Sequence, residues 1–293
     1  MAKELLKLIR EKATQIRKLV LVMTTVAGSG HPGGALSSAD IVATLYFWFL
    51  RHNPDDPNWM KRDRFILSKG HSAPVLYAAL ALCGYFSPNE LLTLRRIDSR
   101  LQGHPSSIKT PGVEVSTGSL GQGLSVACGI AAGLRLCNSD SRVCVLLGDG
   151  ELDEGQVWEA ALFASHYSLS NLIAIVDFNG FQVDGKLCEV MNISPLVLKW
   201  KSFGWKVLEI DGHNIGQIVR GLKKASMYRR GPFVIIAKTV KGKGVSFLEN
   251  NNDYHGKPLN ESQLKAALIE LGGEIYWKER DLLEMLTERC SLV

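Results

Sequence analysis

The sequence lacks several features that would define whole classes of protein. It has no uninterrupted run of about 18 apolar residues, so no membrane-spanning helix and no membrane partner is expected. It has no internal repeat and no low-complexity tract, which excludes a repeat solenoid and a disordered scaffold. Its excess of positive charge is small, with 34 basic and 29 acidic residues giving +5. We therefore expect no nucleic-acid partner, and we interpret the densest basic cluster as a solvated helix end: Lys223, Lys224, Arg229 and Arg230.

Cysteine is also scarce, with six residues in the chain. None forms a Cys-x-x-Cys pair, and none has the spacing to histidine that a zinc site needs. Most stand in apolar contexts, as Cys83 and Cys144 do, which favours small buried side chains in a reducing compartment. We therefore expect a cytoplasmic protein. The other cysteines are Cys128, Cys137, Cys188 and Cys290.

The basic amino terminus resembles a targeting peptide only superficially. Glu4 and Glu11 interrupt the positive charge, and apolar residues from Leu5 to Met23 keep helical spacing. This pattern predicts a mature amphipathic helix, which should end near Gly28 and Gly30 because two glycines break the pattern there.

The rest of the chain alternates between strands and helices. We predict helices over residues 38–50, 73–83, 120–136, 155–167 and 215–224, and a short helix near 89–95 within a loop-rich segment. The helix over 120–136 is built of small residues and should pack closely against other backbone. Strands that are apolar on both faces are predicted over 142–147, 171–177, 205–210 and 232–239.

This alternation predicts an α/β fold with a doubly wound, mainly parallel sheet flanked by helices. Ligands of such sheets bind beyond the carboxyl ends of the strands. The loops after Leu147, Asp177 and Thr239 are therefore the candidates for a functional site.

The loop after Leu147 contains Gly148-Asp149-Gly150 and leads into a helix. Glycines allow close approach of a ligand, and the N–H groups that open a helix favour a phosphate. An aspartate at this point calls for a cation between its carboxylate and the phosphate. Asn179 ends the next predicted strand, and Mg²⁺ prefers such oxygen ligands. Although Gly-Asp-Gly alone is commonly a turn, this series predicts a magnesium–diphosphate site on Asp149, Asn179 and a backbone carbonyl, expected at Phe181.

Several segments together resemble the transketolase family, in family order and over roughly residues 5 to 275. The motif GDGELDEGQ at 148–156 and the DFN at 177–179 resemble its diphosphate-binding domain. The other matching segments are SGHPGG (29–34), DRFILSKGH (63–71), GHP (103–105), STGSLGQG (116–123) and YHGKP (254–258).

The resemblance implies the thiamine-diphosphate-binding fold, with thiamine diphosphate and Mg²⁺ or another divalent cation as cofactors. It implies transfer of a two-carbon ketol unit from a ketose (phosphate) to an aldose (phosphate). Full transketolases continue with pyrimidine-binding and C-terminal domains, whereas residues 1–293 resemble a single diphosphate-binding domain. The chain thus resembles the N-terminal subunit of a split transketolase. We expect a separate C-terminal subunit that carries the pyrimidine-binding domain and the catalytic glutamate, in an α2β2 assembly.

Four histidines stand in loops flanked by glycine or proline, where a core imidazole is less expected: His31, His71, His104 and His255. Ketol transfer needs groups that exchange protons near neutral pH and hold polyol hydroxyls, and imidazole suits both needs. The resemblance implies that all four are catalytic, and that His71 and His255 also lie near the cofactor diphosphate. We interpret the remaining histidines as structural: His52, His166 and His213.

The resemblance assigns further cofactor contacts. Gly150 would donate its N–H to the diphosphate, and Glu154 would reach across a subunit interface towards the partner's catalytic glutamate. The aminopyrimidine and thiazolium rings would be lined by Gly118, Ser119 and Leu120. The segment KGKG at 241–244 is interpreted as a solvated loop rather than a phosphate site.

Other functions remain open at this stage. The E1 α-subunit of a 2-oxoacid dehydrogenase is also a separate chain with a Gly-Asp-Gly motif, but its chemistry would not call for four histidines that face a polyol. A fragment of 1-deoxyxylulose-5-phosphate synthase shares some features, although that family is usually one long chain. A non-catalytic cofactor-binding scaffold would not need the metal ligands and the histidines together.

Overall fold

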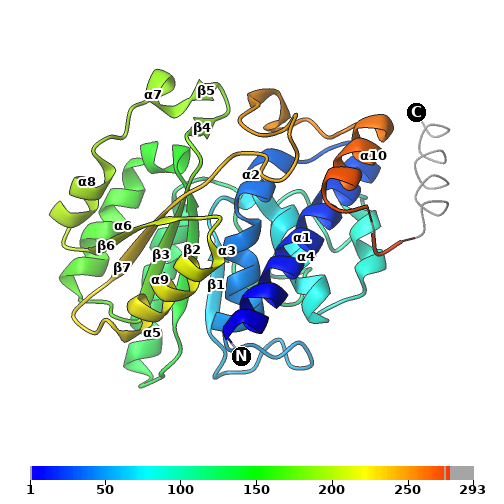
Figure 1. Cartoon of the computed structure of the whole chain (residues 1–293). Helices are drawn as coiled ribbons and strands as arrows, with labels where there is room; N and C mark the ends of the chain where they lie inside the picture. Colours follow the sequence, from blue (N-terminus) through cyan, green and yellow to red (C-terminus); the bar gives the residue numbers. More distant parts are fainter. Residues whose placement is uncertain (1, 274, 278–293) are drawn as a thin grey trace.

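A sheet of five parallel strands forms the centre of the computed structural model, which describes residues 2–273 and 275–277. The strand order is β1-β2-β3-β7-β6 (Figure 1). Four strands confirm the predicted ones: β2 (Val143–Gly148), β3 (Leu172–Phe178), β6 (Lys206–Asp211) and β7 (Phe233–Lys238).

Strand β1 (Arg64–Leu67) is a correction to the sequence analysis, which assigned residues 63–71 to a histidine loop. It pairs in parallel with β2, with Arg64 beside Val143. Its apolar run of three residues is too short to show a strand pattern in the sequence. Because β1 is a strand, the segment from Lys69 to His71 lies at the carboxyl edge of the sheet.

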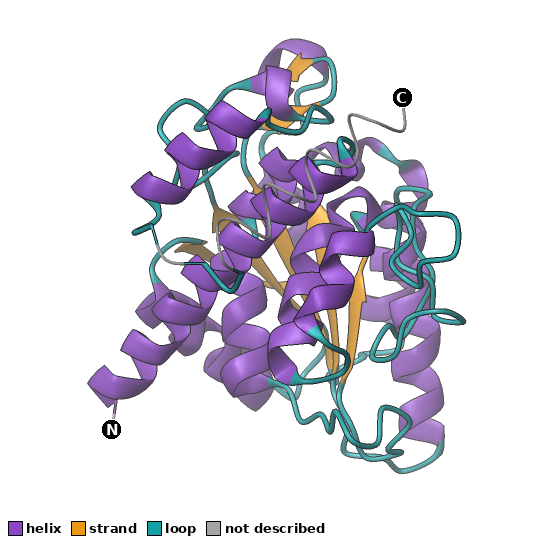
Figure 2. Ribbon diagram, turned by 90° about the vertical axis from the view of Figure 1, so that its right-hand side faces the viewer, coloured by secondary structure: helices purple, strands orange, loops and turns teal. Residues whose placement is uncertain are grey.

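Helices cover both faces of the sheet, which confirms the doubly wound α/β fold (Figure 2). Successive side chains of a strand point to opposite faces. In β2, Cys144 and Leu146 join one apolar core, whereas Val145 and Leu147 join the other. The first core is completed by α1 (Ala2–Ala27), α3 (Ala39–Thr44), α4 (Ala73–Cys83) and α9 (Ile215–Met227). The second is completed by α5 (Gln122–Leu136), α6 (Gly155–His166) and α8 (Leu196–Ser202).

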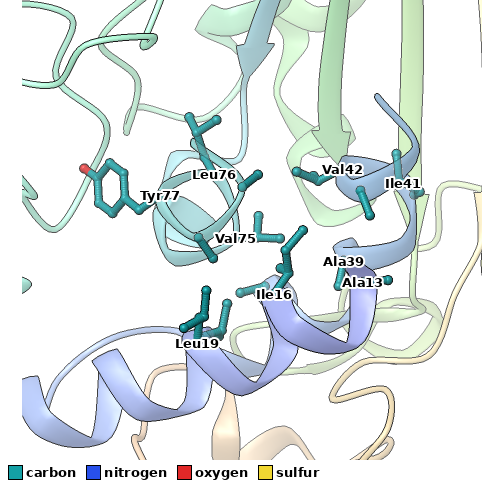
Figure 3. Close-up of a cluster of buried hydrophobic side chains, with 14 of the residues drawn as sticks. Ala13, Ile16, Leu19, Ala39, Ile41, Val42, Val75, Leu76 and Tyr77 are labelled. Atoms are coloured by element: carbon teal, nitrogen blue, oxygen red, sulfur yellow. The ribbon is translucent and has the colours of Figure 1, made fainter. Parts of the chain in front are cut away.

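Helix α1 confirms the predicted amphipathic helix. Its buried residues Ile16 and Leu19 face Val75 of α4 in the close-up of the core, and Ala13 lies beside Ala39 of α3 (Figure 3). The helix ends at Ala27, and Gly28 follows with a positive φ of 53°, as the double glycine predicted.

The remaining elements are short. The predicted helix over 38–50 divides into α3 and a π-helical turn, Leu45–Phe49, and the short helix near 89–95 is a 3-10 turn, Pro88–Thr93. Four elements around the carboxyl edge were not predicted: α2 (Pro32–Ser37), β4 (Phe181–Gln182), β5 (Gly185–Lys186) and α7 (Leu187–Val190). The others are α10 (Glu261–Glu270) and 3-10 turns at Gly70–Ser72, Gly150–Asp153 and Asn252–Tyr254.

Helix α5 packs closely at its start but not along its whole length. A Cβ added to Gly123 would lie 2.3 Å from the Oγ of Ser68, so this glycine is needed for close packing. Gly129 and Gly133 have no such neighbour within 4 Å in the described part of the chain. The expectation of close packing was therefore wrong for the outer side of α5, which is open.

The basic cluster that the sequence analysis interpreted as a solvated helix end is exposed in the structure. Lys223, Lys224, Arg229 and Arg230 are exposed at and beyond the end of α9. No helix among the described residues is long and apolar enough to cross a bilayer. The described cysteines are all free thiols, with Cys137 and Cys188 exposed, and Cys290 lies outside the described residues.

Candidate active site

A cavity of about 460 Å³ opens at the carboxyl edge of the sheet, where this fold predicts a ligand site. All three loops selected from the sequence contribute to its wall: Asp149 and Gly150 after β2, Asn179 and Phe181 after β3, and Lys241 after β7. Four further predicted residues also line it: His71, Leu120, Glu154 and His255.

Asp149 is a buried carboxyl, only 2% exposed, in the wall of this cavity. One carboxylate oxygen, Oδ2, accepts the Gly180 N–H at 2.6 Å, and the other accepts the Gly150 N–H at 3.0 Å. Burial, followed by the negative charge of Asp177, raises the pKa of Asp149 to about 7. A cation beside Asp149 would keep this carboxyl ionised.

The oxygen atoms near Asp149 fit such a cation. The Oδ1 of Asn179 accepts the Phe181 N–H at 3.0 Å, so one turn holds together two residues that line the cavity. Asp149 forms no ion pair among the described residues, because the buried ammonium of Lys69 is bound to Asp177. Those residues hold no cluster of three His, Cys, Asp or Glu side chains that could bind a metal. A cation here would therefore depend on amide and carbonyl oxygens as well as one carboxylate, which suits Mg²⁺.

Three of the predicted histidines form a compact group beside the cavity. The ring centroids of His31 lie 5.4 Å from His71 and 5.6 Å from His255, and those of His71 and His255 are 5.5 Å apart. Burial is the main cause that lowers all three pKa values, helped by neighbouring positive charge: to about 4 for His31, to about 3 for His255, and well below the ordinary value for His71. All three rings are therefore neutral at pH 7.

His104 lies near this group but does not line the cavity. It packs on Gly118, where an added Cβ would be 3.2 Å from the His104 Cδ2. Burial and then Arg95 lower the pKa of His104, and His104 in turn contributes to the low pKa of His31. The structure thus brings all four predicted histidines to one region.

Two buried polar atoms beside the cavity have no hydrogen-bond partner among the described residues: the Nδ1 of His31 and the Nε2 of Gln182. Such atoms are costly unless a water or a ligand binds them. Their location indicates a site shaped for a polar ligand.

The segment from Gly118 to Leu120 is held in place by Glu151, which sequence reasoning missed. Glu151 is 2% exposed, and its carboxylate accepts the N–H groups of Gly121 at 2.8 Å and Gly148 at 3.0 Å. It also accepts a hydrogen bond from Ser68. Leu120 lines the cavity, whereas the side chain of Ser119 is exposed. Glu151 could have been suspected from its place in the GDGE motif, but only the fold shows which groups it binds.

Two buried lysines were also missed. Lys69 is 1% exposed, pairs with Asp177 and donates to the Gly34 carbonyl at 2.7 Å. Lys241 is likewise 1% exposed, which corrects the interpretation of residues 241–244 as a solvated loop. Its Nζ contacts the Nδ1 of His255 at 2.9 Å, and burial lowers its pKa to about 8.

The histidines interpreted as structural lie outside the cavity. Both nitrogens of His52 have partners, the Tyr46 carbonyl at 2.9 Å and the Tyr85 hydroxyl at 3.2 Å. His213 is held by Asp40 and by the Val240 N–H, each at 2.8 Å. His166 contacts the ring of Tyr167 edge-on, at the end of α6.

Comparison with known proteins decides the family. Residues 9–280 match the family model described as the thiamine diphosphate binding domain of transketolase. The chain belongs to the transketolase family. The two strand ends and the four histidine loops described above all lie within the matched residues.

Two similar proteins are themselves named as parts of split transketolases. The 6-deoxy-6-sulfo-D-fructose transketolase subunit SqwG of Clostridium sp. (strain MSTE9) is 45% identical over 267 residues, covering 91% of this chain and 97% of that protein. One of the subunits of the apulose-4-phosphate transketolase of Phocaeicola vulgatus is 39% identical, covering 90% of this chain and 94% of that protein.

Other transketolases are more than twice as long. Human transketolase is 42% identical over 280 residues, which are 94% of this chain but 44% of the human protein. The crystal structure of the Campylobacter jejuni enzyme superposes with a TM-score of 0.87 at 34% identity, covering 98% of this chain and 47% of that one. The chain therefore has the fold of the transketolase diphosphate-binding region and spans less than half of these enzymes.

Proposed function

We propose that the chain is the diphosphate-binding subunit of a two-component transketolase, which transfers a two-carbon ketol unit from a ketose (phosphate) to an aldose (phosphate). The observation that carries this proposal is the cavity that joins Asp149 and Asn179 to a group of neutral histidines. The near full-length similarity to two proteins named as transketolase subunits supports it. On this proposal residues 1–293 act as one diphosphate-binding domain.

Asp149, Asn179 and the carbonyl of Phe181 would hold a divalent cation, Mg²⁺ by preference, next to the diphosphate. The Gly150 N–H and Lys241 would bind the diphosphate itself, together with His71 and His255. Lys241 suits this role because it lines the cavity and forms no ion pair among the described residues. The aromatic rings of thiamine would lie against the segment Gly118, Ser119 and Leu120. When bound, thiamine diphosphate supplies the nucleophilic carbon that breaks and forms the carbon–carbon bond.

The histidines would hold substrate oxygens and move their protons. An ammonium donates hydrogen bonds and accepts none, so the contact with Lys241 makes Nδ1 of His255 an acceptor and leaves the ring hydrogen on Nε2. His255 can therefore donate from Nε2 to a substrate oxygen. The Nδ1 of His31 is buried beside the cavity without a partner among the described residues, and we propose that a substrate hydroxyl supplies that partner. His104, which like His31 lies outside the lining of the cavity, would bind another substrate hydroxyl.

A partner subunit would supply the pyrimidine-binding and C-terminal domains and the catalytic glutamate, in an α2β2 assembly. Glu154 supports this arrangement, because it lines the cavity yet its side chain is exposed. Helices α5 and α6 lead away from that point and expose apolar side chains, with Val126 37%, Leu162 58% and Phe163 42% exposed. We propose that the partner subunit covers this face. We also propose a cytoplasmic location, which the free thiols of the described cysteines support.

The test is ketol transfer from xylulose 5-phosphate to ribose 5-phosphate with thiamine diphosphate and Mg²⁺. We expect no turnover by the chain alone, and turnover on mixing with a pyrimidine-domain subunit encoded beside it. Asp149→Ala should abolish turnover, whereas Asp153→Ala, which removes an exposed carboxylate from the same loop, should retain it. Turnover by the chain alone would refute the need for a partner.

The test also separates the other functions. An E1 α-subunit is not favoured, because the relatives described above are transketolases. If the chain binds thiamine diphosphate but the mixture transfers no ketol unit from any of a broad series of ketoses, the chain is a scaffold rather than an enzyme subunit.

A further inference from the structure

Lys241, which lines the cavity, lies in a loop that is also attached by hydrogen bonds on its side away from the cavity. Strand β7 ends at Lys238, and the next residue still bonds to the sheet, with Thr239 N–H donating to the Phe178 carbonyl at 3.0 Å. Beyond it the chain leaves the sheet, and the Val240 N–H has no strand beside it. This N–H donates instead to the Nε2 of His213 at 2.8 Å. The imidazole thus accepts the backbone hydrogen bond that a neighbouring strand would otherwise accept, one residue before Lys241.

The hydrogen-bond geometry fixes the tautomer of His213. Its Nε2 accepts a backbone N–H, so that nitrogen carries no hydrogen. Its Nδ1 lies 2.8 Å from the Oδ2 of Asp40 and therefore donates to this carboxylate. Burial alone would raise the pKa of Asp40, but the Arg17 guanidinium and the bond from His213 hold that pKa below its ordinary value. Asp40 is thus an ionised acceptor that keeps the ring in the one neutral form able to bind Val240.

The loop has two other attachments close by, and both are made by backbone groups. The Asn250 N–H donates to the Lys241 carbonyl at 2.9 Å, and the Gly242 N–H donates to the Gly33 carbonyl at 3.0 Å. Gly242 has a φ of 75°, and an added Cβ would lie 2.2 Å from the Leu248 carbonyl oxygen, so the chain turns sharply there. These contacts fix the backbone on both sides of Lys241, and its Nζ, at the other end of the side chain, donates to the Oδ1 of Asn252 and to the Nδ1 of His255.

We propose that His213, held as its Nδ1–H tautomer by Asp40, is a positioning residue that sets Lys241 in the cofactor cavity through the Val240 amide. His213 is not among the residues that line the cavity. The inference rests on the proposed function only in taking Lys241 as the group that binds the diphosphate. The placement of Lys241 itself can be tested without any cofactor.

The first experiment measures that placement in the apo chain by acylation with acetic anhydride and peptide mass spectrometry. His213→Phe keeps a planar ring but removes the acceptor, whereas His213→Gln can offer its amide oxygen in place of Nε2. Loss of one hydrogen bond should increase acylation of Lys241 by about two- to twelvefold in His213→Phe. His213→Gln should restore most of the protection. Lys69, also 1% exposed, is the internal control and should stay protected in both variants.

The second experiment measures the Kd of thiamine diphosphate at saturating Mg²⁺ by calorimetry, in the full chain. His213→Phe should weaken binding by the same about two- to twelvefold. In a Lys241→Met background, His213→Phe should change the Kd no further, because the effect of His213 on binding requires the Lys241 ammonium, which that background lacks.

Several outcomes would overturn the proposal. An equal rise in acylation at Lys69 and Lys241 would mean general loosening of the fold, and an unchanged Lys241 would mean that His213 does not place it. Equal weakening of Kd in both backgrounds would mean that His213 acts by another route. If the wild-type chain failed to bind thiamine diphosphate both alone and when mixed with its partner subunit, the proposed function would be wrong, and the acylation result would still decide the role of His213.

Discussion

The contact between Gly70 and the segment before Leu120 offers a sharp test of how the cavity wall is built. Gly70 lies at the carboxyl edge of the sheet, between Lys69 and His71. A Cβ added to it would lie 2.8 Å from both the Gly118 nitrogen and the Thr117 carbonyl carbon, whereas ordinary contacts begin near 3.4 Å. In Gly70→Ala this backbone must therefore retreat by about 0.6 Å. Backbone atoms cannot rotate aside as a flexible side chain does.

Such overpacking typically costs about 1–3 kcal/mol. The melting temperature of Gly70→Ala should fall by about 2–12 °C, given the usual 2–4 °C per kcal/mol in domains of this order of size. Because the displaced backbone is the wall beside Leu120, the Kd of thiamine diphosphate should rise as well, by about fivefold for each 1 kcal/mol by which the misfit is larger in the bound state than in the free chain. Scanning calorimetry and titration calorimetry measure the two effects on the same sample.

Gly129→Ala is the matched control. Gly129 lies within α5 with open space around its Cα, so alanine should fit and stabilise the free chain by up to about 1 kcal/mol. If Gly70→Ala melted at the wild-type temperature and bound thiamine diphosphate equally well, the reasoning from the close contact would be refuted.

Three other predictions concern the histidine group, the buried ion pair and the exposed face. Because folding lowers the pKa of His31 to about 4 and of His255 to about 3, the unfolded chain binds more protons below pH 6.5. The contribution of these two histidines to the free energy of unfolding should therefore fall as the pH drops from 6.5 towards 4, while the raised pKa of Asp149 acts in the opposite direction, and urea titrations of the apo chain with and without the two histidines would measure their share. Lys69→Met should cost about 3–5 kcal/mol in urea denaturation, because it leaves the Asp177 carboxylate buried without its partner. Leu162→Glu should weaken binding of the partner subunit in sedimentation experiments without changing the Kd of thiamine diphosphate for the chain alone, because it places a charge on the exposed face of α6.

Each of these has a clear contrary result. A pH profile below 6.5 that is unchanged when both His31 and His255 are replaced by asparagine would show that these rings do not cause the slope. A stable Lys69→Met would mean that the ion pair is not needed to keep Asp177 buried. Ile269→Glu changes an apolar position on α10 that is even more exposed, 73% against 58% for Leu162, so equal loss of partner binding in that variant would show that the effect is not specific to the α6 face.

Much of the site was predictable because its residues belong to short local sequence motifs. The strand that ends at Gly148, the Asp149 loop and the four histidine loops each have a local signature of glycine, proline or an apolar run. Such signatures fix where a strand stops and which residues follow it, and parallel strands present those residues at one edge. The doubly wound fold and the meeting of Asp149 with Asn179 followed from that rule.

The tertiary structure determined the features that depend on which segments pair in space and which side chains are buried. Strand β1 exists because a run of three apolar residues pairs with β2, and a strand that short has no pattern of its own. In the sequence, Lys241 is a charged residue in a glycine-rich loop, a pattern that predicts exposure to solvent. It is buried in the structure because the loop folds back over the cavity, held by His213 and Gly33.

The sequence by itself thus determined the family, the order of the elements and the residues at the strand ends. Only the tertiary structure determined which charges are paired. Lys69 and Asp177 are far apart in the chain but form a buried ion pair, whereas Lys241 is left to face the cavity. The physical reason is that the cost of a buried charge depends on its neighbours in space, and sequence spacing does not specify those neighbours across loops.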